Sequence, residues 1–224
     1  MRLRCCRTNS SEKTGEPVDW PTEDAIALRP SLGPNVPVGG NRLTAWLGRS
    51  MLRVAGWRIE GEFPDRSKLI IAVAPHSSAL DFALTIAVIW GLGLQASYLA
   101  KESLFRFPLG LLMRAFGGIP VERDSPQGLV GQLVERFNER SSLVLGITPE
   151  GTRKNVTEWK RGFALIAQGC NVPVLPAIIN YRTKVVRFAA MITDVGNVDH
   201  TMLAMQQAAA TGVPRSEHRR RPRV

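Results

Sequence analysis

A histidine and an aspartate with a spacing suited to proton transfer follow the first strongly apolar run of the sequence. His76 and Asp81 begin and end the run His-Ser-Ser-Ala-Leu-Asp, which comes directly after the apolar residues 69–74. An imidazole accepts a proton near neutral pH, and a neighbouring carboxylate fixes its tautomer and stabilises the imidazolium. The same residues also fit a helix start at which Ser78 or Asp81 caps the first turn. The spacing alone leaves both interpretations open.

A second polar group follows another apolar run, residues 143–147. The run Pro-Glu-Gly-Thr-Arg occupies residues 149–153. Pro-Glu-Gly is typical of a turn, and Gly151 allows backbone amides to approach a ligand closely. Arg153 and the adjacent Lys154 add positive charge that suits a phosphate. An exposed turn with ordinary surface charges explains the same run.

Two weaker signals lie between and after these groups. Arg123 ends the segment Gly-Gly-Ile-Pro-Val-Glu-Arg, in which residues 118–121 have the character of a short strand. The run Val-Pro-Val-Leu-Pro, residues 172–176, has the character of a core or edge strand interrupted by prolines. Neither signal is specific by itself.

The segments between these groups alternate between strand and helix character. We predict strands at residues 69–74, 96–100, 118–121, 143–147, 173–179 and 185–191, and helices at 81–90, 108–116, 126–140 and 163–170. This alternation predicts a single α/β domain with a mostly parallel central sheet flanked by helices. In such sheets ligands bind beyond the carboxyl ends of the strands, where His76 and Glu150 are expected.

The N-terminal part differs in composition from the rest. Residues 1–40 are rich in proline and carry five basic and five acidic residues, which predicts a disordered tail. An amphipathic helix is expected at 42–56, with an apolar face that contains Trp46. This helix either packs on the core or lies on a membrane surface. We place the domain at 41–212 and a basic C-terminal tail at 213–224.

Composition narrows the possible functions. The chain of 224 residues has 29 Lys and Arg against 19 Asp and Glu, a formal charge of +10, which suggests an anionic partner. Three cysteines and three histidines without zinc spacing predict neither a disulfide framework nor a metal site. We expect no signal peptide, because residues 1–19 lack an apolar run. The uncharged stretch 82–100 contains glycines and polar residues, so we predict a helix and a strand there.

Taken together, the four groups resemble the glycerol-phosphate/lysophospholipid acyltransferase family, which includes the 1-acylglycerol-3-phosphate acyltransferases. The His-x4-Asp block of that family is matched by His76 and Asp81, and its Gly/Arg block by residues 118–123. Its Pro-Glu-Gly-Thr-Arg block is matched residue for residue at 149–153, and its Val-Pro strand at 172–176. The resemblance covers about residues 41–195 and is closest to compact bacterial members.

The resemblance implies transfer of a fatty acyl group from acyl-CoA or acyl-carrier protein to a lysophospholipid or glycerol-phosphate hydroxyl, in phospholipid biosynthesis. His76 would be the general base and Asp81 would orient it. The substrate-binding residues would be Arg123, Glu150, Gly151, Thr152 and Arg153, and the apolar segments 82–94 and 104–116 would line an acyl groove.

We expect no cofactor, no metal and no nucleic-acid partner, and a cytoplasmic location with peripheral attachment to an anionic membrane. An acceptor without phosphate, such as a glycolipid or an amino-acid-headed lipid, and a non-catalytic lipid- or nucleic-acid-binding protein are the alternatives.

Overall fold

The computed structural model describes residues 32–121, 128–151 and 158–215. Seven strands form one sheet in the order β1-β7-β6-β2-β5-β3-β4. Only β6 and β7 pair in an antiparallel manner; the other neighbouring strands are parallel. The strands are β1 (Arg58–Glu60), β2 (Lys68–Ala74), β3 (Ala96–Lys101), β4 (Gly118–Val121), β5 (Leu143–Ile147), β6 (Val174–Asn180) and β7 (Val185–Phe188). The predicted α/β class with a mostly parallel sheet is confirmed.

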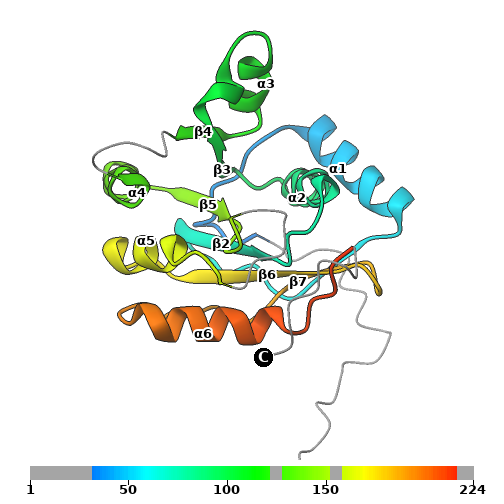
Figure 1. The fold of residues 1–224 in the computed structure, drawn as a ribbon. Coiled ribbons are helices and arrows are strands. Elements are labelled where there is room, and N and C mark those ends of the chain that lie inside the picture. Colours follow the sequence, from blue (N-terminus) through cyan, green and yellow to red (C-terminus); the bar gives the residue numbers. More distant parts are fainter. Residues whose placement is uncertain (1–31, 122–127, 152–157, 216–224) are drawn as a thin grey trace, which may run out of the picture.

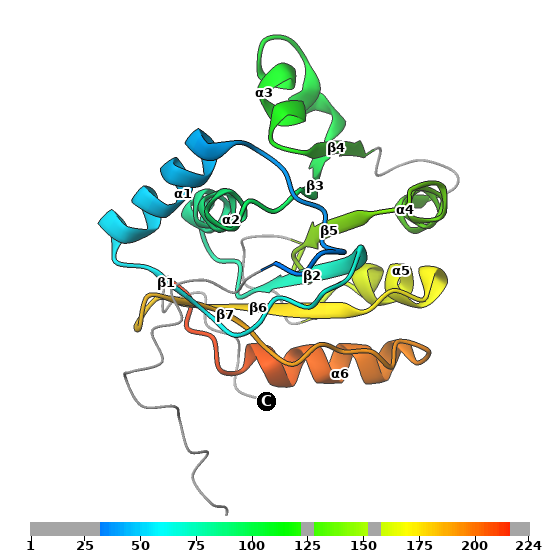
Figure 2. The same cartoon turned by 180° about the vertical axis from the view of Figure 1, so that it is seen from behind.

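Helices cover both faces of this sheet (Figures 1 and 2). One face carries α1 (Arg42–Ala55) and α2 (Ala79–Leu92). The other carries α4 (Gly128–Glu139), α5 (Gly162–Cys170) and α6 (Val198–Ala209). The short helices η1 (Glu102–Phe105) and α3 (Leu109–Ala115) project beyond the edge formed by β4.

The central strand β2 shows why the sheet needs two covering layers. Its apolar residues are buried without interruption from Leu69 to Ala74. Leu69, Ile71 and Val73 belong to the core beneath α1 and α2, whereas Ile70, Ala72 and Ala74 belong to the core beneath α4, α5 and α6. Side chains alternate between the faces of a strand, so a continuous apolar run requires a packing partner on each side.

The predicted domain limits differ from the structure at both ends. Residues 1–31 lie outside the described residues, but Val36 is buried in the core beneath α2 and Val38 forms a bridge with Leu94. At the other end, Val213 forms a parallel bridge with Asn180. The ordered domain therefore extends into both segments that were predicted as tails. Apolar packing and backbone pairing explain this extension. The segments involved are too short to show a periodic sequence pattern, so the sequence did not predict it.

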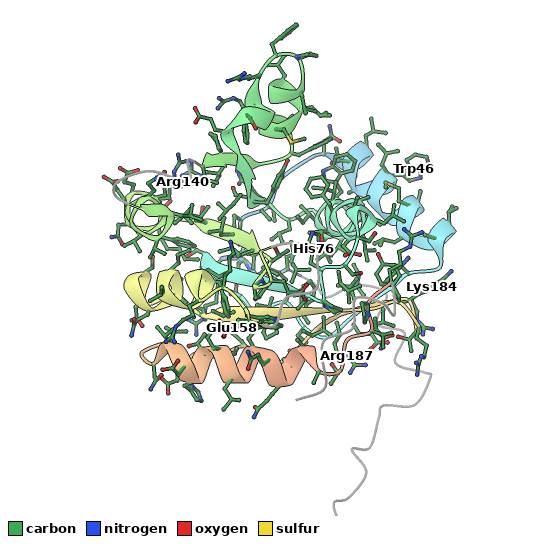
Figure 3. All side chains as sticks on the ribbon, viewed as in Figure 1. Trp46, His76, Arg140, Glu158, Lys184 and Arg187 are labelled. Atoms are coloured by element: carbon green, nitrogen blue, oxygen red, sulfur yellow. The ribbon has the colours of Figure 1, made fainter. Side chains whose placement is uncertain are left out.

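The helix predicted at 42–56 is present as α1, but it does not pack through its apolar face, as the core-packing interpretation expected. Gly48 and Leu52 are the buried residues of α1. The predicted apolar face is exposed to solvent: Leu43 and Trp46 are each 61% accessible and Val54 is 89% accessible. Figure 3 shows Trp46 on the outer side of the helix.

Candidate active site

The site begins where β2 ends and α2 begins. Ser78 is the N-cap of α2, and its Oγ accepts a hydrogen bond from Leu80 N–H at 2.9 Å. The Asp81 carboxylate accepts one from Ser78 N–H at 2.7 Å, which completes a capping box. The capping interpretation of this spacing is therefore confirmed. The same carboxylate also faces His76, so the two interpretations do not exclude each other.

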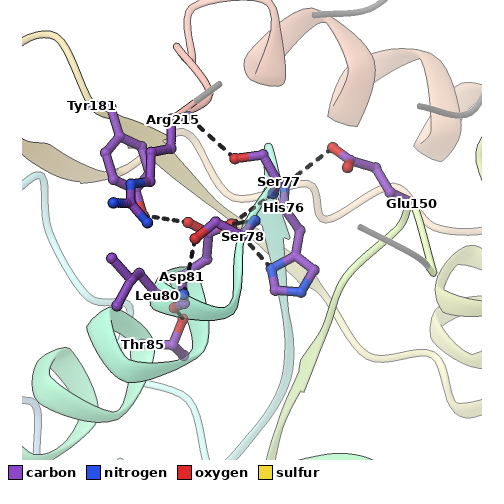
Figure 4. A network of polar contacts seen from close by, with 9 residues as sticks. All are labelled: His76, Ser77, Ser78, Leu80, Asp81, Thr85, Glu150, Tyr181 and Arg215. Atoms are coloured by element: carbon purple, nitrogen blue, oxygen red, sulfur yellow. Dashed lines mark hydrogen bonds and ion pairs between the residues drawn. The ribbon is translucent and has the colours of Figure 1, made fainter. Parts of the chain in front are cut away.

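Asp81 is the centre of the polar network in Figure 4 and is fully buried. Its Oδ2 accepts hydrogen bonds from Ser77 N–H at 2.6 Å and Ser78 N–H, and it lies 3.4 Å from Nδ1 of His76. Its Oδ1 accepts a hydrogen bond from the hydroxyl of Tyr181. The N-terminus of α2 further stabilises the negative charge, because the helix dipole is positive at this end.

His76 has the geometry of a proton acceptor. With Nδ1 directed at a buried carboxylate, the tautomer that carries its proton on Nδ1 is favoured, which leaves a lone pair on Nε2. The side chain is 17% accessible, so it is partly open to solvent. A second pair, His200 and Asp194, is 3.8 Å apart with both side chains more than half exposed, and lacks such an environment.

Glu150 approaches from the neighbouring strand. Because β5 and β2 are parallel and Ile147 pairs with Ala72, both chains leave the sheet at the same edge. Glu150 is buried, and its Oε1 accepts a hydrogen bond from His76 N–H at 3.2 Å. Gly151 has φ +62°, a left-handed conformation that favours glycine, and its N–H closes a turn onto the carbonyl of Thr148 at 3.0 Å.

The structure thus brings together His76, Asp81 and Glu150, with Gly151 next in the chain. The other three predicted substrate-binding residues, Arg123, Thr152 and Arg153, lie outside the described residues. Within the described part of the chain, no three His, Cys, Asp or Glu side chains are arranged to hold a metal ion. Among the same residues, no helix is long and apolar enough to cross a membrane.

Two contributors to the site were not predicted from the sequence. Tyr181 follows β6, which lies on the other side of β2 from β5, and its hydroxyl reaches Asp81. Burial, together with the hydrogen bond and charge of Asp81, raises the pKa of Tyr181 above its ordinary value of 10.0, while Arg215 and Ser78 lower it. Arg215 donates its backbone N–H to Ser77 Oγ at 3.2 Å. Tyr181 stands just beyond the strand predicted at 173–179, and nothing else in the sequence marks it.

The fold and the site define an α/β enzyme with an imidazole, oriented by a buried carboxylate, at the carboxyl edge of a parallel sheet. The chain belongs to the acyltransferase family, whose model matches residues 57–180. It also resembles the crystal structure of the 1-acyl-sn-glycerophosphate (LPA) acyltransferase PlsC from Thermotoga maritima. That match has a TM-score of 0.56 and 18% identity and covers 75% of this chain and 76% of the other. Comparison with curated protein sequences finds no match.

Proposed function

We propose that the protein transfers a fatty acyl group from a thioester, acyl-CoA or acyl-carrier protein, to a hydroxyl of a lysophospholipid or glycerol-phosphate-type acceptor. The observation that carries this proposal is the imidazole of His76, 3.4 Å from the buried carboxylate of Asp81, in a chain of the acyltransferase family. The similar fold of a 1-acyl-sn-glycerophosphate acyltransferase supports the choice of acceptor class.

In this mechanism Nε2 of His76 removes the proton from the acceptor hydroxyl as its oxygen attacks the thioester carbonyl. The tetrahedral intermediate collapses with cleavage of the C–S bond, and the thiolate takes the proton back from the imidazolium. Asp81 stabilises that imidazolium and holds the ring. Arg123 and Arg153 would bind the acceptor phosphate, and Glu150, Gly151 and Thr152 would position the acceptor.

A small apolar cavity beside the site marks the side of α2 to which we assign the acyl chain. It lies between α2 and the sheet and is lined by residues that include Leu84, Thr85 and Val88 of α2 and Val73 of β2. Thr85 also donates to the carbonyl of Asp81 at 2.8 Å, so the cavity begins within one turn of the site. We propose that the acyl chain lies against this inner side of α2.

The exposed side of α1 supports attachment to a membrane. Leu43, Trp46 and Met51 lie on this side, with the exposed Arg42 and Arg53 on the same helix. Apolar and basic residues in this arrangement are typical of helices that lie in the interface of anionic lipids. We propose that α1 docks the enzyme on the surface that supplies its lipid acceptor.

The experiment that tests the reaction measures free thiol released from palmitoyl-CoA by the purified chain. Lysophosphatidic acid is the first acceptor, with a lysoglycolipid and an amino-acid-headed lysolipid for comparison. We expect His76→Ala to lower turnover by about 10²–10⁴, the usual loss on removal of a general base, while the protein remains folded. The matched control is His200→Ala, because His200 is exposed on α6.

Wild-type turnover by a folded His76→Ala protein would overturn the mechanism. Absence of thiol release and of acylated product from the wild type with every acceptor, with either acyl-CoA or acyl-carrier protein as donor, would overturn the function.

A further inference from the structure

The two oxygens of the Asp81 carboxylate have different partners. Oδ2 accepts hydrogen bonds from the backbone N–H groups of Ser77 and Ser78, and it faces His76. Oδ1 accepts a hydrogen bond from the hydroxyl of Tyr181. Tyr181 lies one residue beyond the region that the family model matches. A buried anionic oxygen without a hydrogen-bond donor destabilises the fold. The Tyr181 hydroxyl therefore favours the orientation of the carboxylate in which Oδ1 faces it.

The ring of Tyr181 is held independently of its hydroxyl. It packs edge-on against Trp57, with ring centroids 4.9 Å apart. Its backbone N–H donates to the carbonyl of Val213 at 3.0 Å, and Val213 N–H donates to Ile179 at 3.1 Å. Contacts with the end of β6, with Trp57 and with the C-terminal segment therefore hold the ring in place without any contribution from its hydroxyl.

We propose that Tyr181 is a positioning residue of the acyl-transfer site, whose hydroxyl holds the Asp81 carboxylate so that Oδ2 faces the imidazole of His76. This inference rests on the proposed function. The hydroxyl opposes rotation of the carboxylate, which the two amides on Oδ2 alone would allow. It also draws negative charge toward Oδ1, which weakens the attraction of Oδ2 for an imidazolium and keeps more of the base unprotonated.

Besides Ser77, groups from four segments lie around this pair. Glu150 comes from the segment after β5, Ser78 from the start of α2, Tyr181 from the end of β6, and Arg215 from the C-terminal segment. The raised pKa of Tyr181 keeps its phenol protonated, and so a donor, at every pH at which the enzyme would work.

The test is Tyr181→Phe, and the sequence offers a matched control. Tyrosine occurs only twice, and the hydroxyl of the other, Tyr98, lies 3.4 Å from the carbonyl of Met113, outside the site. With palmitoyl-CoA and lysophosphatidic acid, Tyr181→Phe should lower kcat about tenfold, less than loss of the general base, with much smaller changes in either KM. The acidic limb of its pH–rate profile should move to higher pH, because a carboxylate without the phenol favours the imidazolium more strongly. Tyr98→Phe should show neither change.

The outcomes separate this inference from the proposed function. If His76→Ala is inactive but Tyr181→Phe has the wild-type kcat and pH profile, Tyr181 has no positioning role. A loss of kcat without movement of the acidic limb, or a Tyr181→Phe protein that does not fold, would indicate a purely structural hydroxyl and would also overturn it. If His76→Ala retains full turnover, the proposed mechanism itself fails.

Discussion

Asp81 combines two tasks that are commonly divided between residues. Its carboxylate caps the first turn of α2 through the N–H groups of Ser77 and Ser78, and it faces the imidazole of His76 at 3.4 Å. The turn that positions the histidine is therefore closed by the group that would stabilise its protonated form. Structural and chemical effects of a substitution at Asp81 can be separated by the choice of replacement.

We predict different outcomes for Asp81→Ala and Asp81→Asn. Alanine leaves the buried amide of Ser77, the partly buried amide of Ser78 and the Tyr181 hydroxyl without their acceptor, and the free energy of unfolding should fall by about 2–4 kcal/mol. Asparagine can accept from both amides with its oxygen and should cost less than half as much. Both should lose most acyl transfer, because neither carries the charge that stabilises the imidazolium.

Urea denaturation and thiol release measure the two effects of these substitutions. Asp194→Asn is the control, since that side chain is 75% exposed. An Asp81→Asn enzyme with near wild-type turnover would contradict the role of the charge.

Part of the site was predictable from the sequence and part was not. His76, Asp81 and Glu150 follow apolar strands in runs that match the motifs of a family, and this resemblance, not the spacing alone, selected them. Tyr181 stands 100 residues after Asp81 in no distinctive run. Its placement depends on β6 lying next to β2, and strand order is a property of the tertiary structure that one sequence does not contain.

The packing of α1 on α2 shows the same limit at the level of an element. Periodicity identified the helix and its apolar stripe, but the helix packs through Gly48 and Leu52, away from most of that stripe. A Cβ atom at Gly48 would lie 2.4 Å from the amide nitrogen of Gly91 and 2.6 Å from the carbonyl oxygen of Ala87. Close contact between the two backbones stabilises this pair of helices, and the hydropathy of the residues cannot predict such a contact. Arg49 of α1 donates to the carbonyl of Gly91 at 2.9 Å, so a basic side chain also takes part in this helix contact.

We predict that Gly48→Ala destabilises the protein, although this change in a helix ordinarily stabilises by up to about 1 kcal/mol. The methyl group would force α1 away from α2, and overpacking of this kind costs about 1–3 kcal/mol. Gly162→Ala in α5 is the matched control, because a Cβ atom there has open space. In thermal denaturation Gly48→Ala should melt below the wild type and Gly162→Ala should not. A higher melting temperature for Gly48→Ala would show that the helices are not in close contact.

Other elements lacked a usable pattern. The strand β1 has only three residues, Arg58–Glu60, of which Ile59 alone is strongly apolar. The helix α6 buries Val198, Thr201, Met205 and Ala209, a stripe that includes a polar residue and that was not recognised as helical. Both elements depend on the neighbours they pack against more than on their own composition.

At the scale of the whole molecule, the formal charge of +10 and the exposed side of α1 suggest attraction to the same kind of surface. Since α1 packs on α2, and α2 begins just after His76, docking through α1 would hold the candidate site close to the lipid. In the proposed docking, electrostatic attraction would bring the protein to an anionic bilayer, and apolar side chains that enter the interface would retain it there.

We predict that Trp46→Glu lowers partitioning onto vesicles of phosphatidylglycerol and phosphatidylcholine by about tenfold, because it replaces an inserted apolar ring with a repelled charge. Flotation of the purified chain measures this. Leu203→Glu is the matched control: Leu203 is also exposed, 54% accessible, but lies on α6, which covers the opposite face of the sheet. Equal losses for the two variants would exclude a specific docking side.

The contacts of the site join parts of the chain that are far apart in sequence. His76 and Glu150 are separated by 74 residues, Asp81 and Tyr181 by 100, and Ser77 and Arg215 by 138. Closure of such long loops carries an entropic cost and slows folding. A refolding chain that has formed only β2 and α2 would carry the histidine, the aspartate and the two capping amides without Glu150, Tyr181 and Arg215. Enzymatic activity should consequently reappear after most of the secondary structure, which makes turnover a strict measure of complete folding.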